Sequence, residues 1–194
     1  MSRGRLWAVL AVLVLTASLG SVLWRPKESE GVVRLNRPAP AISPDLYATG
    51  LQVREYRADG SLKLILKSES LDHRNRGAVS HFSAPDLWTW PVTGSPWHTT
   101  SRHGQSHADD HLITLQEQVV MTQNDSATQT ITTIETDKLR VNTDSEQANT
   151  DAAVRITREG EGGVHEVQAV GSVVEYGQGR VQLTSKVRAT HEPG

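Results

Sequence analysis

The histidines between Trp97 and His111, in the stretch WHTTSRHGQSHADDH, are the residues of this chain most suited to chemistry. His103, His107 and His111 recur at every fourth residue, and two aspartates precede the last of them. On an α-helix this spacing would place three imidazoles on one face, and three protein ligands with an open fourth position are typical of catalytic zinc. Whether these histidines can bind a metal therefore depends on the element that carries them.

Other signals of catalysis are weak. Ser106, His107 and Asp109 have the residue types of a hydrolase triad, but no serine lies in a Gly-x-Ser-x-Gly elbow. The sequence contains no Gly-Lys-Ser/Thr phosphate-binding loop. It also contains no cysteine, which excludes thiolate chemistry and disulfides. Its 20 basic and 22 acidic residues give no basic surface for nucleic acid. We therefore predict no catalytic residue, no metal, no cofactor and no nucleic-acid partner.

The first 24 residues, MSRGRLWAVLAVLVLTASLGSVLW, predict a membrane anchor. Residues 6–24 carry no charged side chain, and about 20 apolar residues span a bilayer core of roughly 30 Å. Trp7 and Trp24 stand where interfacial aromatic residues are common. We predict a short cytoplasmic tail over residues 1–5, followed by one transmembrane helix over the uncharged run.

A cleaved signal peptide is the alternative to this anchor. Its apolar region would cover residues 6–15, with cleavage after Gly20. Both alternatives export the rest of the chain. Residues 25–44, RPKESEGVVRLNRPAPAISP, contain half of the eight prolines and predict an extended periplasmic tether.

After Pro44, apolar and polar residues alternate as they do in β-strands. The segment SLKLILK places Leu62, Leu64 and Leu66 on one face, and the turn ADG with Gly60 joins it to LQVREY in a predicted hairpin. Further strands are expected in AVSHFSA, LWTW, LITLQEQVVMT, TQTITTIET, KLRVNT, AAVRIT, VHEVQAVGSVVEY and RVQLTSKVRAT. Many short strands separated by turns predict an all-β sandwich, barrel or jelly roll.

In an all-β fold, the four-residue spacing of the histidines does not bring their imidazoles together as it would on a helix. His103 is expected to end one strand, and HADDH is expected to form the turn into the next, with Asp109 and Asp110 as turn residues. A solvated turn is therefore favoured over a zinc site. The pattern alone leaves open whether the apolar interior is an ordinary packed core or an open slot for an apolar ligand.

The order and spacing of these segments resemble the LptC family of inner-membrane-anchored components of lipopolysaccharide export, from Tyr47 to Glu192. DGSLKLILKSESLDH is similar to the family's first hairpin, FSAPDLWTW to its F-x-x-P-x-L strand, PWHTTS to its Trp-initiated strand and LITLQEQVVM to its L-x-L-x-G-x-V strand. IETDKLRVNTDSEQANTDAAVRI resembles its T-T-D … L-x-V stretch, and GGVHEVQAVG with VQLTSKVRATHE resembles its closing hairpin. The chain departs from the family at Glu117, which replaces a glycine, and near Lys67–Ser68, where a small apolar residue is missing.

This resemblance implies a fold and a function. The fold is a twisted, V-shaped (OstA-like) β jelly roll over residues 45–192, behind one transmembrane helix. The protein would be a single-pass inner-membrane protein with its N-terminus cytoplasmic and its bulk periplasmic, and not an enzyme. It would take lipopolysaccharide from an ABC-type (LptBFG-like) transporter and pass it to an LptA-like periplasmic bridge protein. An exported structural scaffold without lipid binding is the alternative.

Three sets of residues follow from the pattern and the resemblance together. An apolar groove for acyl chains is expected to be lined by Leu62, Leu64, Leu66, Phe82, Ile113, Leu115, Val119, Leu139, Val141, Val154, Ile156, Val181 and Leu183. The family's β-augmentation implies partner edges at Leu51 and Val53 for the transporter and at Val181, Leu183 and Val187 for the bridge protein. Gly60 and Gly163 are expected to be turn glycines that keep the nearby strands in shape.

Overall fold

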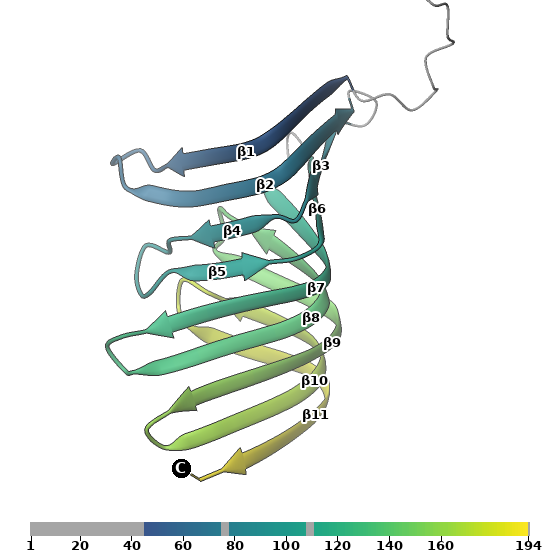
Figure 1. The fold of residues 1–194 in the computed structure, drawn as a ribbon. Coiled ribbons are helices and arrows are strands. Elements are labelled where there is room, and N and C mark those ends of the chain that lie inside the picture. The colour runs from purple at the N-terminus through teal and green to yellow at the C-terminus, as the bar shows by residue number, and fades with distance from the viewer. Residues whose placement is uncertain (1–44, 75–77, 108–110, 194) are drawn as a thin grey trace, which may run out of the picture. The chain divides into compact units, whose positions relative to one another are not determined.

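Every regular element in the described part of the chain is a β-strand (Figure 1). The computed structural model describes residues 45–74, 78–107 and 111–193. The strands are β1 (Leu46–Tyr56), β2 (Leu62–Arg74), β3 (Val79–Ser83), β4 (Asp86–Thr89), β5 (Trp97–Thr100), β6 (His103–His107), β7 (Leu112–Asp125), β8 (Thr130–Asn142), β9 (Gln147–Gly160), β10 (Gly163–Glu175) and β11 (Arg180–Glu192).

All of these strands join one antiparallel sheet. Its order is β11-β10-β9-β8-β7-β5-β4-β2-β3-β6; in addition, β1 pairs with β2, and β6 pairs with β7. From β7 to β11, strands that are consecutive in the sequence are neighbours in the sheet, as short turns dictate. This part of the fold is therefore a simple meander, whereas β2 to β7 are interleaved.

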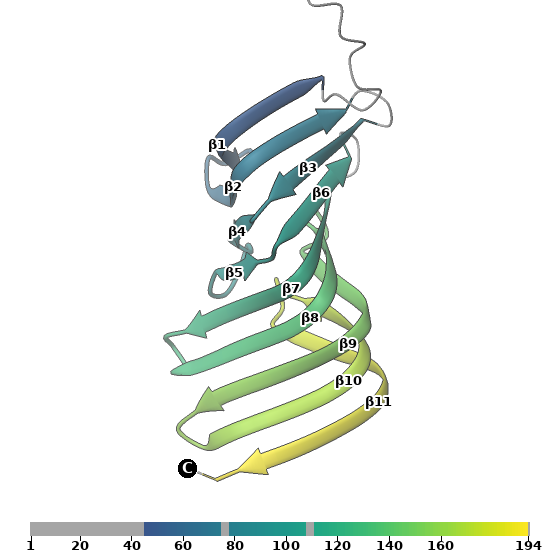
Figure 2. The ribbon, with the colours of Figure 1, turned by 45° about the vertical axis from the view of Figure 1, so that its right-hand side comes forward.

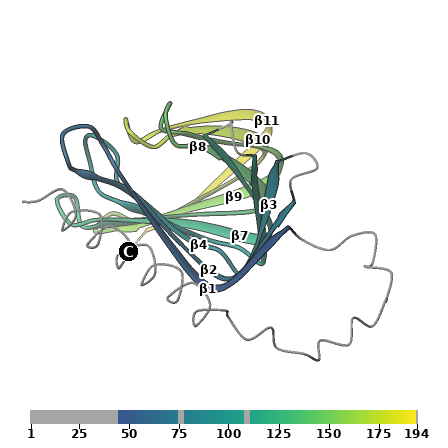
Figure 3. The ribbon, with the colours of Figure 1, turned by 90° about the horizontal axis from the view of Figure 1, so that it is seen from above.

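The sheet folds into two walls because each long strand bends near its middle (Figures 2 and 3). Strand β7 pairs with β6 before its bend and with β5 after it, and β2 pairs in the same way with β4 and β3. The first wall contains β4, β5 and residues 51–56, 62–67, 119–125, 130–136, 154–160, 163–169 and 187–192. The second wall contains β3, β6 and residues 46–49, 70–74, 112–116, 138–142, 147–150, 172–175 and 180–185.

Buried hydroxyl groups occupy the bends. The Oγ of Ser68 lies 2.7 Å from the carbonyl oxygens of both Ser70 and Ser83. The Oγ1 of Thr136 donates a hydrogen bond of 2.8 Å to the carbonyl of Ala153. A bulge breaks the ladder of backbone hydrogen bonds, and a hydroxyl donor satisfies a carbonyl that the ladder leaves free. The family's missing small apolar residue near Lys67–Ser68 thus has a small, buried, polar counterpart in Ser68.

The departure at Glu117 does not remove the bend of β7. Glu117 and its neighbour Gln118 have φ angles of +61° and +54°, in the left-handed region that a glycine adopts most easily. The register between β7 and β8 shifts between Gln116 and Val119. The bend therefore forms with two non-glycine residues, at a cost in backbone strain.

The structure confirms the all-β prediction and the first hairpin, whose turn is closed by a 2.8 Å hydrogen bond from the Arg57 amide to the Ser61 carbonyl. Two predicted strands, TQTITTIET and KLRVNT, are one continuous strand, β8, because the irregularity between Thr136 and Arg140 bends the strand without ending it. The predicted tail, transmembrane helix and tether lie outside the described residues. In the part of the chain that is described, no helix has the length and apolarity to cross a membrane.

Candidate functional site

The inward faces of the two walls bring together the residues that were predicted to line a groove. Ten of them are buried, namely Leu64, Leu66, Phe82, Ile113, Leu115, Val119, Leu139, Val141, Val154 and Ile156. Leu62, Val181 and Leu183 are half-buried, and the last two pack against the buried cluster. The residues predicted from the alternation of apolar and polar side chains therefore lie together between the two walls.

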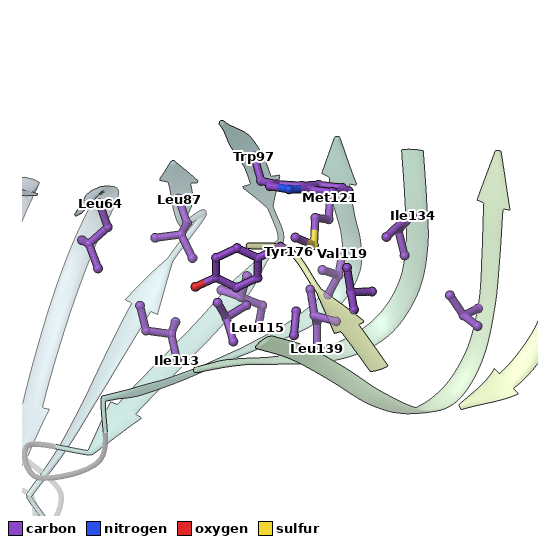
Figure 4. Packing of buried hydrophobic residues seen from close by; sticks show 14 of the residues in the cluster. Leu64, Leu87, Trp97, Ile113, Leu115, Val119, Met121, Ile134, Leu139 and Tyr176 are labelled. Atoms are coloured by element: carbon purple, nitrogen blue, oxygen red, sulfur yellow. The ribbon is translucent and has the colours of Figure 1, made fainter. Parts of the chain in front are cut away.

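This interior is filled where the two walls face each other (Figure 4). Leu87 and Val119 on the first wall and Leu115 and Leu139 on the second are all 0% exposed. These four side chains belong to one cluster of buried hydrophobic residues. An acyl chain would reach these side chains only if the two walls moved apart.

Sequence reasoning missed eight members of the cluster: Leu87, Trp97, Met121, Ile134, Ala148, Ala169, Val174 and Tyr176. Alternation could have found most of them. Met121 follows the predicted Val119 by two residues on the same strand, and Tyr176 follows Val174 by two. Tyr176 was overlooked because it stands just past the end of β10, beside a glycine-rich turn.

Tyr176 lies between the walls, close to Leu115 and beneath Trp97 in Figure 4. Its hydroxyl donates to the carbonyl of Asn142 at 3.2 Å, and burial raises the pKa of this phenol well above its usual value. The indole nitrogen of Trp97 is buried without a hydrogen-bond partner among the described residues. The space between the walls is thus apolar and closed to solvent at this point.

A hollow of about 1090 Å³ follows the bend of strands β7 to β11. Each of the five strands contributes three consecutive residues, namely 118–120, 135–137, 153–155, 168–170 and 186–188. Of the predicted groove lining, Val119 and Val154 contribute to it. Its lining includes both acidic and basic residues, namely Glu135, Asp137, Arg155, Lys186 and Arg188, so its chemistry differs from that of an apolar slot.

The histidines do not form a shared site in the described structure. The prediction that His103 ends a strand is wrong, because His103 begins β6. The preceding strand, β5, stops at Thr100, and the chain bends before β6. His103 and His107 stand four residues apart on one strand, which separates them by about 13 Å. His103 lies 3.8 Å from Glu117. No group of three potential ligands occurs among the described residues, and residues 108–110 of the predicted turn lie outside them.

The two ends of the sheet carry the predicted partner edges. Among the described strands, β1 pairs with β2 alone and β11 with β10 alone. Leu51 is half-buried, whereas Val53 is 42% exposed and Val187 is 55% exposed. Gly60 and Gly163 have φ angles of +84° and +105° at the tight turns before β2 and at the start of β10. Each edge therefore offers unpaired backbone groups together with exposed apolar side chains.

A comparison with protein families matches residues 9–192 to LptC, described as lipopolysaccharide-assembly, LptC-related. The chain belongs to the LptC-related family. The resemblance inferred from the strand motifs is confirmed, and this LptC-related protein has a role in lipopolysaccharide transport. Members of this family are components of a lipopolysaccharide transport system, which is consistent with a location in the cell envelope.

Among solved structures, this LptC-related chain is similar to LptH of Pseudomonas aeruginosa, the LptA-homologous periplasmic component of the conserved lipopolysaccharide transport device. The TM-score is 0.53 at 10% sequence identity, and the match covers 67% of this chain and 95% of LptH. This likeness supports the fold. A search of curated proteins found no match.

Proposed function

We propose that this LptC-related protein is an inner-membrane-anchored adaptor for lipopolysaccharide. Residues 6–24 anchor it, residues 25–44 hold the β-domain away from the membrane, and the domain receives lipopolysaccharide from the ABC-type transporter. The acyl chains lie between the two walls, and the lipid passes on to the periplasmic bridge protein. No covalent chemistry is needed for these steps.

The observation that carries this proposal is the continuous apolar interior shared by the two walls. Val and Leu side chains on both walls supply it, and aromatic residues are few. Burial of an acyl chain in such surroundings is worth about 0.8 kcal/mol for each methylene group. Ten buried methylenes would therefore contribute about 8 kcal/mol relative to the same groups in water, which acts against the cost of parting side chains that now touch each other.

The free edges of β1 and β11 support the proposed direction of transfer. An edge strand binds another edge through backbone hydrogen bonds, and its side chains add specificity. The β1 edge is proposed to contact the transporter, because it follows the anchor and tether in the chain. The β11 edge, at the other end of the sheet, is proposed to contact the bridge protein. Two joined rolls would then present one continuous interior.

The test is site-specific photo-crosslinking to lipopolysaccharide in cells, with the probe in the full chain. Probes at Leu64, Phe82 and Val181 report on the interior. Lys67, three residues after Leu64, and Gln182, next to Val181, are exposed control positions on the same strands. The proposal predicts lipid adducts from the first set and none from the controls.

A second candidate function, a structural scaffold without lipid binding, is favoured by the filled centre of the interior. A scaffold needs the core for stability alone. It predicts protein adducts from probes on β1 and β11 and no lipid adduct from any interior position. An absence of interior adducts in a folded, membrane-located protein would therefore favour the scaffold and refute the adaptor.

A further inference from the structure

The free margins of the two walls are joined by a set of polar contacts between four turns. On the first wall these are the turn after β1 and the loop between β4 and β5. On the second wall they are the turns after β8 and β10. The Nη2 of Arg57 lies 3.1 Å from the Oε1 of Glu146, and the backbone amide of Val92 donates to the same carboxylate oxygen at 3.0 Å. One glutamate of the second wall thus binds two turns of the first.

Two further contacts join the same margins. The Nζ of Lys63 on the first wall lies 2.5 Å from the Oδ1 of Asp144 on the second, and the hydroxyl of Thr93 donates to the carbonyl of Gly177 at 3.0 Å. Glu55 holds the Lys63 ammonium from the other side at 2.8 Å. We call these contacts, centred on Arg57–Glu146 and Lys63–Asp144, the margin clasp.

The clasp residues are partly screened from solvent, and backbone carbonyls fix the orientation of Arg57. Arg57 and Glu146 have side chains that are each 21% exposed, and Lys63 is 15% exposed. Arg57 is also fixed by the backbone carbonyls of Leu62, at 2.9 Å, and of Trp90. A bound arginine of this kind is a rigid fork, so its pairing with Glu146 has a defined geometry.

A glycine makes room for this pairing. A Cβ atom added at Gly177 would lie 2.0 Å from the Oε2 of Glu146, so any larger residue would displace the carboxylate. Gly177 follows Tyr176, the buried ring between the walls. The clasp therefore stands directly above a filled part of the interior, at the side where the walls are not joined by the bend.

We infer that the margin clasp is a lateral gate: it holds the two walls together in the empty protein and opens on this side to admit acyl chains. This inference rests on the proposed lipid-transfer function. Ion pairs at a solvent boundary contribute little individually, so a few of them can hold the walls closed and still be broken by the burial of an acyl chain. The bends opposite the clasp, with their bulges, act as the hinge.

The absence of cysteine from the chain allows a direct test with pairs of introduced cysteines in the full chain in detergent micelles. Ala58→Cys with Ser145→Cys places one spin label on the clasp turn of each wall, and both positions are exposed. Ala58→Cys with Val92→Cys is the matched control, since both labels then lie on the first wall. Double electron–electron resonance gives the label distance with and without purified lipopolysaccharide.

The gate predicts that lipopolysaccharide lengthens the distance between positions 58 and 145 and leaves the control distance unchanged. Arg57→Glu should lengthen the first distance without lipid, and Arg57→Lys, which keeps the positive charge, should lengthen it less. Joining positions 58 and 145 with a short bifunctional reagent should abolish lipid adducts at a Leu64 photoprobe.

The outcomes separate the gate from the function on which it rests. If the cross-linked protein still forms the Leu64 adduct, or if the adduct forms with no change in the distance between positions 58 and 145, the gate is refuted and lipid transfer stands. If the unlinked protein forms no adduct, both the gate and the lipid-transfer function are refuted.

Discussion

The centre of the sheet and its β11 end are built from the same alternating pattern, yet they differ in burial. At the centre, Leu115 and Val119 on β7 are 0% exposed, because the other wall covers them. On β11, Val181 and Leu183 are half-buried, and every described residue from 184 onwards is exposed. The difference arises from position in the sheet: β7 has neighbours on both sides and a facing wall, and β11 has one neighbour.

This contrast indicates a division of labour. The centre stabilises the fold, since the two walls there exclude water from a shared core. The end strand contributes less to stability and leaves backbone groups and apolar side chains free for another sheet. Alternation alone therefore predicts which face a residue occupies and does not predict whether that face is covered.

The largest test of the contrast is truncation of a side chain in each region. Leu115→Ala removes a fully buried side chain and should lower the free energy of unfolding by about 3 kcal/mol. Val187→Ala, at a position 55% exposed, should change it by less than about 0.5 kcal/mol. Urea unfolding of the full chain in detergent measures both. Equal losses would mean that β11 is covered in the free protein.

The bends that bring the walls together are the next point to test. Thr136→Val keeps the shape of the side chain but removes the donor to the Ala153 carbonyl, which should cost about 1–3 kcal/mol of stability. Thr133→Val on the same strand, where the threonine is half-buried, is the matched control. If the two variants unfold at the same urea concentration, the hydroxyl does not support the bend.

The edge character of β11 can be tested by adding a charge. Val187→Lys should weaken binding of the bridge protein about tenfold, equivalent to about 1.4 kcal/mol, because lysine on an edge opposes strand addition. Val53→Lys changes the opposite edge, at β1, and should leave this affinity unchanged. Titration of the labelled bridge protein measures both variants. A larger loss from Val53→Lys would reverse the proposed assignment of the two edges.

The bend of β7 offers a smaller effect, and one that should be stabilising. Glu117 has a φ of +61°, and Glu117→Gly introduces the glycine that the family pattern carries at this position. Relief of left-handed strain is worth about 1–2 kcal/mol and the added chain entropy of glycine costs about 0.5–1 kcal/mol, so a gain of up to about 1.5 kcal/mol is expected. Thermal unfolding of the variant checks it. A lower melting temperature would show that the Glu117 side chain has a stabilising contact that outweighs the strain.

Much of this architecture could be predicted from the sequence, because alternation is a local signal. Alternation places Leu64 and Leu66 on one face of their strand, and both are buried. The bends could not be predicted, since Glu117 and Lys186 adopt positive φ angles that their residue types do not announce. At the bends, buried hydroxyl groups bond free carbonyls, and β2 and β7 each change from one partner strand to another.

The margin clasp could not be predicted for a related reason. Arg57 and Glu146 are separated by 89 residues, and each stands in a turn of mixed charge that would be solvated in most proteins. Nothing in either turn specifies the other as its neighbour. They meet because the folded sheet brings the margins of its two walls together, a long-range consequence of the bends.

The clasp should be insensitive to pH across the physiological range, and this is the smallest effect expected. The hydrogen bond from Lys63 lowers the pKa of Asp144 below its ordinary 3.8, so the stabilisation is present above that value and is lost only as the pH falls through the lowered pKa. Partial burial acts to lower the pKa of Lys63, but its hydrogen bonds to Asp144 and Glu55 outweigh this and raise it above 10.5. Both groups are therefore charged between pH 5 and pH 8.

The imidazole of His111 also lies near this pair, with its Nδ1 3.5 Å from the Oδ2 of Asp144. His111 immediately precedes β7 and Asp144 follows β8, both on the second wall, so this contact does not join the two walls. The label distance between positions 58 and 145 should stay constant from pH 8 to pH 5 and lengthen only as the pH falls through the lowered pKa of Asp144. A lengthening between pH 7 and pH 5 would show that a histidine, and not the Lys63–Asp144 pair, controls the separation of the walls.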